Sequence, residues 1–188
     1  MAYYQLLSYI FPEKIMFSDL LSDDDSLLMN CTKRNCDLRT ENFSNYLQKG
    51  LDDFTSKWIK QELLFYEEYY GKGFVTHDHD MDFEINGKTT PANIFILSDC
   101  YCGSSGDAFV QTSKKSSKTK VIGRNTAGVT DYSNLAIIDF GNYQLMYPTS
   151  KVNKNHINGV GVAVDVYIPW TPEHLKKDVD LEKVLTMI

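Results

Sequence analysis

The sequence predicts a mixed α/β fold, because helical and strand patterns alternate along its 188 residues. The clearest helical pattern runs from Glu41 to Tyr70, where large apolar side chains recur at steps of mostly three and four residues. A continuous apolar run at 93–97 is typical of a buried strand, and a second strand pattern follows at 120–123. Hydrophobic residues make up 43% and charged residues 23% of the chain, which excludes intrinsic disorder. This length fits one domain over residues 1–188.

The N-terminal third is predicted to be helical. Residues 3–10 suit a short helix that stops before Pro12, and residues 14–21 alternate loosely, as a strand would. The apolar stripe between Glu41 and Tyr70 has helical spacing and is expected in the core rather than at a cofactor. It comprises Phe43, Leu47, Leu51, Phe54, Trp58, Leu63 and Tyr66.

Alternating histidines and aspartates at 77–82 admit two interpretations, a metal site or the polar edge of a hairpin. In a strand, His77 and His79 would lie on one face and the aspartates on the other. The turn residues Asn86-Gly87-Lys88 follow shortly afterwards and favour the hairpin. We therefore expect a hairpin in residues 1–92 and no metal ion.

The second half predicts a denser alternation of strands and helices. Two strand patterns are joined by the two-residue turn Gly141-Asn142, as in a hairpin. The expected elements are strands at 93–97, 120–123, 135–140, 143–147 and 160–168, and helices at 108–116 and 172–185.

The net charge of −6 argues against nucleic acid as a partner, because such a surface repels phosphates. The basic cluster Lys114, Lys115, Lys118 and Lys120 has no interleaved aromatic residues and is interpreted as a solvated helix face. No apolar run approaches the ~20 residues of a membrane span. The first residues lack the pattern of a secretory signal, so a cytoplasmic location is expected if Met1 is the natural start.

The four cysteines are expected to be reduced thiols. Cys31 and Cys36 form a C-x4-C pair, and Cys100 and Cys102 form a C-x-C pair, which together are not a familiar zinc spacing. A thiol or metal protein built on these residues is a weaker alternative. No cofactor is expected.

The most informative segment is Gly103-Ser104-Ser105-Gly106-Asp107, which follows the strand at 93–97 and leads into a helix. A serine at such a turn would lie at a helix N-terminus, where free N–H groups stabilise a developing oxyanion. Gly103 and Gly106 would allow a substrate to approach the backbone closely. The same residues also suit an ordinary helix start, with Ser104 or Ser105 as the N-cap.

Four segments in this order resemble the tail-specific, or carboxyl-terminal processing, serine peptidases. They are Ile96–Phe109 around S-x-x-D, Val121–Gly128 as V-x-G-x-x-T-x-G, Gly159–Val166, and Asp178–Leu185 as D-x-x-L-E-x-V-L. Within this family, the motif G-S-S-G-D-A-F at 103–109 is most similar to the tricorn-like branch. The resemblance implies a crotonase-like spiral ββα core with a mixed sheet, and it covers residues 93–188.

The resemblance places the nucleophile on Ser104 and an oxyanion-hole donor on the N–H of Ser105. Asp107 takes the acidic position of the motif, as a helix-start residue rather than a catalyst. Val129 stands where the tail-specific branch has a lysine base, so a Ser-Lys dyad is excluded. Asp165 or Glu173 would supply the later acidic partner.

The general base is not identified by the sequence. The four histidines, His77, His79, His156 and His174, do not fall where the base of the family lies, and each is interpreted as a surface or loop residue. The upstream D-x-R-x-N-x-G-G strand of the family is matched only in part, by Asp37–Thr40, which lacks the glycines. The chain therefore resembles the C-terminal portion of such a peptidase and is expected to need an upstream segment.

The sequence thus predicts a serine-type peptidase domain that acts on a peptide or protein substrate and has little activity as this chain alone. The alternative is a non-catalytic module of the same fold that binds a peptide or a small apolar ligand. Either could form a homo-oligomer.

Overall fold

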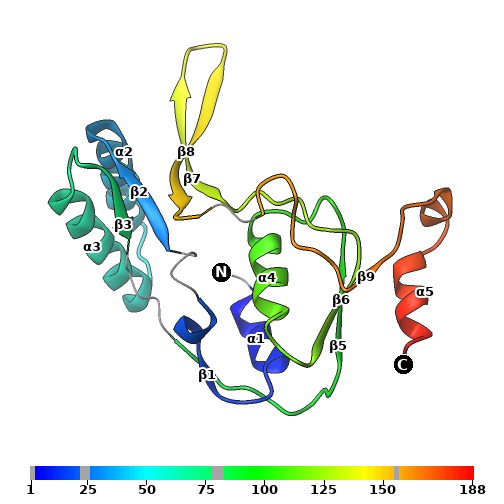
Figure 1. The fold of residues 1–188 in the computed structure, drawn as a ribbon. Coiled ribbons are helices and arrows are strands. Elements are labelled where there is room, and N and C mark those ends of the chain that lie inside the picture. Colours follow the sequence, from blue (N-terminus) through cyan, green and yellow to red (C-terminus); the bar gives the residue numbers. More distant parts are fainter. Residues whose placement is uncertain (1–2, 22–25, 78–82, 155–156) are drawn as a thin grey trace. The chain divides into compact units, whose positions relative to one another are not determined.

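The computed structural model describes residues 3–21, 26–77, 83–154 and 157–188 (Figure 1). The chain divides into two compact units, each assembled from segments that are distant in sequence. Unit 1 comprises Met1–Asp23, Asp80–Asp131 and Lys154–Ile188, and unit 2 comprises Asp24–His79 and Tyr132–Asn153. The single domain expected from the sequence stays a prediction.

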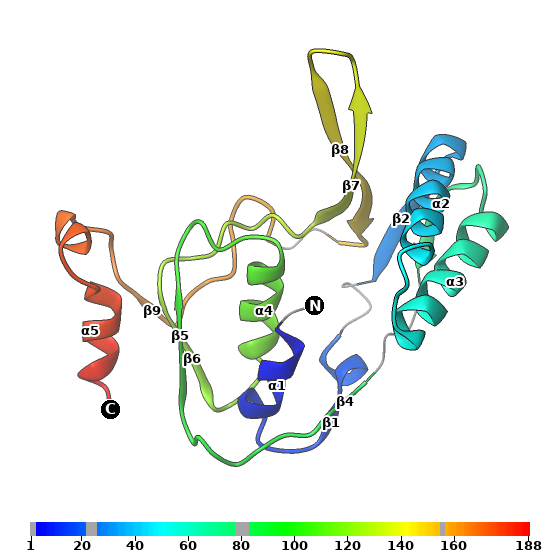
Figure 2. The same cartoon turned by 180° about the vertical axis from the view of Figure 1, so that it is seen from behind.

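Unit 1 is built around a β–α–β crossover. Strand β5 (Ile94–Ser98) leads through helix α4 (Ser105–Ser113) to strand β6 (Thr119–Gly123), and β5 and β6 pair in parallel. Strand β9 (Val166–Tyr167) adds to the other side of β6, also in parallel. Figure 2 shows the same strands from behind, with α4 packed along them. This connection brings the carboxyl end of β5 and the amino end of α4 to the same edge of the sheet.

The core of this crossover is formed by branched apolar side chains. Val110 of α4 and Val121 of β6 are fully buried and pack with Val162. Burying three such side chains stabilises the unit by roughly 1.5–3 kcal/mol each. The position of α4, and therefore of the turn that precedes it, is fixed by this packing.

A second cluster in unit 1 surrounds helix α1 (Tyr4–Ile10). Leu7 and Ile10 pack with Leu20 of the 3-10 helix η1 (Phe17–Leu20). The two-residue strands β1 (Ile15–Met16) and β4 (Glu84–Ile85) pair next to it, and the chain ends with η3 (Pro172–Leu175) and α5 (Val179–Leu185).

Unit 2 is a four-stranded antiparallel sheet with two helices. The strand order is β3-β2-β8-β7, with bounds Gly73–His77, Leu27–Cys31, Gln144–Val152 and Tyr132–Asp139. Helices α2 (Lys33–Leu47) and α3 (Asp53–Glu68) begin at the N-caps Thr32 and Asp52, whose side chains accept a backbone N–H. Their buried side chains form one core with the sheet, which comprises Met29, Cys31, Cys36, Phe65 and Tyr66.

The predicted class, a mixed α/β fold, is confirmed, and so is the hairpin of β7 and β8. The helical stripe at 41–70 belongs to two helices rather than one, because Gly50, with a φ of +71°, breaks the pattern between them. Part of the stripe is core, as Tyr66 is buried and Phe43 packs against it and meets Trp58 edge to face.

The hairpin predicted across 77–88 is wrong. The turn of this hairpin was predicted at 86–88. Strand β4 lies just before these residues and pairs with β1, whereas the next strand, β5, pairs with β6, so the two flanking strands belong to different sheets. His79 and the aspartates at 78–82 lie outside the described residues.

Two further predictions for unit 1 are shortened in the structure. Residues 160–168 form a strand only at 166–167, since Gly161 has a φ of +76°, far from strand values. The helix predicted at 172–185 consists of η3 and α5, because the side chain of Asp178 caps a new helix at the N–H of Leu181.

Candidate active site

Ser104 occupies the turn between β5 and α4 in a conformation that is unusual for its residue type. It is the N-cap of α4, and its φ and ψ are +57° and −115°. Among the described non-glycine residues, only Ser104 and Asn134 have a positive φ. Such backbone costs about 1–3 kcal/mol and is concentrated at functional sites. Ser104 is exposed to solvent.

Ser105 begins the helix directly after this turn and is also exposed. Its backbone N–H donates no hydrogen bond within the part of the chain that the structure describes. The next N–H, that of Gly106, is used, because it donates to the carbonyl of Gly103 at 3.0 Å. A free N–H beside an exposed serine hydroxyl is the arrangement that an oxyanion hole requires.

The turn is held by the buried carboxylate of Asp107. Its Oδ2 accepts hydrogen bonds from the N–H of Ser104 at 2.8 Å and of Val129 at 2.9 Å. Its Oδ1 accepts one from the N–H of Gly128 at 2.9 Å. One side chain therefore joins the serine turn to the loop after β6. Asp107 is fully buried and acts on the backbone, in agreement with the helix-start role predicted for it.

Gly103 and Gly106 are needed for the packing of the turn against the rest of unit 1. A Cβ at Gly103 would lie 2.9 Å from Cγ2 of Val129, and one at Gly106 would lie 2.6 Å from Sγ of Cys102. The space beside both glycines is thus filled by side chains of this chain. Their predicted role in substrate binding stays a prediction.

Val129 lies next to the turn, as the resemblance indicated. It is about half exposed, and its N–H is one of the three donors to Asp107. A valine side chain cannot accept a proton, so Val129 cannot be the general base and contributes only its backbone contact with Asp107.

The two candidates for an acidic partner have other contacts. Asp165 lies 2.6 Å from the ammonium of Lys114, and its second oxygen accepts the N–H of Val121 at 2.7 Å. Partial burial acts to raise the pKa of Asp165, but the Lys114 and Val121 contacts outweigh it and hold the pKa below its ordinary value. Glu173 is exposed in the first turn of η3. The structure does not pair either carboxylate with Ser104.

The two described histidines are not the surface residues that the sequence indicated. In unit 2, Nε2 of His77 lies 3.1 Å from both oxygens of the buried Glu62. In unit 1, Nε2 of His174 lies 3.3 Å from Asp180. Their side chains are only 13% and 11% exposed, and each contacts a carboxylate. His79 and His156 lie outside the described residues.

A partly buried ion pair connects helix α5 to the residue that follows β6, and sequence reasoning missed it. Arg124 donates to both oxygens of Asp180, at 3.0 and 2.7 Å, and the pair raises the pKa of the Arg124 guanidinium. Both residues lie inside segments that carry the family resemblance. Their opposite charges were the available signal, but no spacing rule links positions 56 residues apart.

Neither a metal site nor a membrane helix is found in the described ranges. No group of three His, Cys, Asp or Glu side chains there is placed to hold a metal ion. The helices of those ranges are too short or too polar to cross a bilayer. All four cysteines are free thiols.

No protein-family model matches the chain, and no curated protein matches it either. Structures of mature CPAF, alone and in complex with lactacystin, align over 98% of this chain with TM-scores of 0.56 and 0.57 and 14% identity. The tricorn protease aligns over 55% of this chain and 10% of its own, with a TM-score of 0.37 and 21% identity.

The aligned region is 39% and 40% of the two CPAF chains, so this chain spans about two fifths of their length. At such low identity the likeness shows a shared fold. The chain therefore has a mixed α/β fold that it shares with CPAF.

Proposed function

We propose that the chain is a serine-type peptidase domain in which Ser104 is the nucleophile. The observation that carries the proposal is the exposed serine with a positive φ at the β5–α4 turn, next to the free N–H of Ser105. A peptidase-related fold supports it. The finer assignment, a tail-specific, tricorn-like enzyme with a crotonase-like core, is part of the same proposal.

In the proposed reaction, Oγ of Ser104 attacks the carbonyl carbon of a peptide bond and gives up its proton to a general base. The N–H of Ser105 donates to the oxyanion that forms. The amine then leaves with a proton, and water hydrolyses the acyl-enzyme to regenerate the serine. The substrate is thus a peptide or protein.

The general base is the part of the mechanism with the least support among the described residues. Within the described part of unit 1, the hydrogen-bond partners of His174 are Thr171, Arg124 and Asp180 and do not include Ser104, and Val129 replaces a lysine. We therefore propose that the base comes from residues outside these 188, and that Asp165 or Glu173 supports it. Without its base, a serine nucleophile loses several orders of magnitude in rate.

The test is labelling of the full-length protein with a fluorophosphonate, read by intact mass. Attack by Oγ on phosphorus releases fluoride and leaves a single adduct. We expect the adduct on the wild type and on Ser105→Ala, which keeps its N–H, and none on Ser104→Ala. An adduct that survives in folded Ser104→Ala would refute the assignment.

The same labelling of the 188-residue chain alone locates the base. No adduct on the folded chain agrees with a base from outside it, whereas a Ser104-dependent adduct places the base within it. If the full-length protein is folded and unlabelled, a peptide-binding module without catalysis is the better description.

A further inference from the structure

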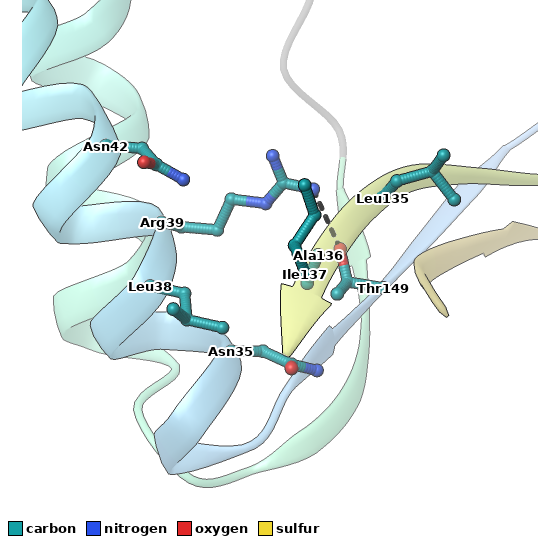
Figure 3. Close-up of a pocket in the computed structure, with 8 residues that line it drawn as sticks. All are labelled: Asn35, Leu38, Arg39, Asn42, Leu135, Ala136, Ile137 and Thr149. Carbon is teal, nitrogen blue, oxygen red and sulfur yellow. Dashed lines mark hydrogen bonds between the residues drawn. The ribbon is translucent and has the colours of Figure 1, made fainter. Parts of the chain in front are cut away.

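A small pocket in unit 2 contains an arginine, Arg39, that pairs with no carboxylate of the described residues. The pocket has a volume of about 220 Å³ and lies between helix α2 and strand β7 (Figure 3). Arg39 and Asn42 of α2 line it on one side, and Leu135 and Ile137 of β7 line it on the other. All of these residues belong to unit 2.

Within the described ranges, the guanidinium of Arg39 is anchored through one nitrogen, Nη2. Its Nη2 donates to the carbonyl oxygen of Asn134 and, at 2.9 Å, to Oγ1 of Thr149. A guanidinium has five N–H groups. The three on Nε and Nη1 have no hydrogen-bond partner, and no carboxylate pairs with Arg39, within the described ranges.

The backbone of β7 is distorted where it anchors this arginine. Ser133 pairs with Ser150 and Leu135 with Pro148, but no pair forms between them at Asn134 and Thr149. Asn134 has a φ of +57°, and its carbonyl accepts from both Arg39 and Thr149. A strained residue that orients a partly buried cation is typical of a binding site, since an ordinary ladder would not need it.

The chemistry of the pocket selects an anion with an apolar group. A guanidinium fork binds a carboxylate through two parallel hydrogen bonds. Besides Arg39, the lining has an apolar part, Leu38, Leu135, Ala136 and Ile137, and a polar part, Asn35, Asn42 and Thr149. The volume is below the ~300–1,000 Å³ of sites for drug-sized molecules, so the occupant is about one residue in size.

We propose that this pocket binds a carboxylate carried by a small branched apolar group. Two sources share this chemistry, the last residue of a peptide that ends in leucine and a free branched carboxylic acid. The inference uses no residue of unit 1, so it stands or fails independently of Ser104.

The first experiment needs no variant. Acetyl-Gly-Gly-Leu, its C-terminal amide and acetyl-leucine are titrated into the protein, and binding is measured by calorimetry. We expect the acid peptide to bind at least about tenfold more tightly than the amide, because hydrogen bonds to charged groups are the stronger kind. Equal affinities, or no binding of any of the three at millimolar concentration, would overturn the proposal.

Acetyl-leucine identifies the source of the carboxylate. If the acid peptide binds tenfold more tightly than acetyl-leucine, the pocket reads the end of a peptide chain. If the two bind alike, the free acid is sufficient. Both results support a carboxylate site.

A matched pair of variants then tests the arginine. Arg39→Met should remove the preference for acid over amide, whereas Arg34→Met, an exposed residue on the same helix and outside the pocket, should preserve it. If Arg39→Met fails to fold, Ile137→Asp replaces it. That position is half exposed, and a negative charge there should weaken the acid peptide more than the amide, which loses only the apolar contact. A preference unchanged in every folded pocket variant would contradict the assignment.

Discussion

The buried carboxylate of Asp107 has three hydrogen-bond donors, and all of them are backbone N–H groups. One comes from the N-cap of its own helix and two come from the loop after β6. Because Asp107 is at the start of α4, the helix dipole also favours its negative charge. The buried side chain thus stabilises the conformation of the turn from within unit 1.

Replacement of Asp107 by alanine should lower the free energy of unfolding by about 3 kcal/mol, since three backbone donors, one of them buried, lose a charged acceptor. Urea unfolding followed by circular dichroism measures this loss. The control is Asp178→Ala, which removes an exposed cap from α5 and should cost about 1 kcal/mol. Similar losses in the two variants would mean that Asp107 is an ordinary cap.

The loop after β6 and the loop before β9 meet backbone to backbone, and glycine makes this possible. The N–H of Gly159 donates to the carbonyl of Gly128 at 3.0 Å, and the N–H of Val162 donates to Oγ1 of Thr126 at 2.7 Å. A Cβ at Gly161 would overlap the carbonyl group of Thr126. These contacts position the N–H groups that reach Asp107.

Two glycines of the same loop give a matched test of this packing. Gly159 and Gly161 have φ values of +72° and +76°, but only Gly161 is crowded, since nothing lies within 4 Å of a Cβ at Gly159. Gly159→Ala should therefore cost only the ~1–2 kcal/mol of left-handed backbone. Gly161→Ala should cost at least about 3 kcal/mol, because backbone must move as well. Equal midpoints in thermal unfolding would show that the loops are not tightly packed.

Local patterns predicted the elements and the serine turn, but not the pairings over long distances. The Gly103–Asp107 segment could be recognised because glycine and small polar residues between a strand and a helix have few interpretations. The hairpin with its turn at 86–88 was mispredicted because a turn signal does not say which sheet each flanking strand joins, and β4 and β5 join different sheets. The anchoring of Arg39 by Asn134 spans 95 residues and has no local signature.

The two compact units each contain a pair of cysteines, and the thiols differ sharply in exposure. Cys31 and Cys36 are fully buried in the core of unit 2, and burial raises the pKa of the Cys31 thiol to about 12. In unit 1, Cys100 is exposed and Cys102 is partly buried, with a pKa that burial raises. Because the thiolate is the reactive form, burial and a raised pKa both slow the reaction of a thiol with an alkylating reagent.

Alkylation of the native protein should therefore follow a fixed order. Iodoacetamide at neutral pH should modify Cys100 first and Cys102 slowly, while Cys31 and Cys36 react only when unit 2 opens. Peptide mapping by mass spectrometry after timed quenching assigns each site. Repeating the labelling in increasing urea then measures the opening of unit 2 separately from global unfolding, since the buried thiols Cys31 and Cys36 report on that unit alone. If Cys31 or Cys36 reacts as fast as Cys100 without denaturant, the core of unit 2 is not closed as described.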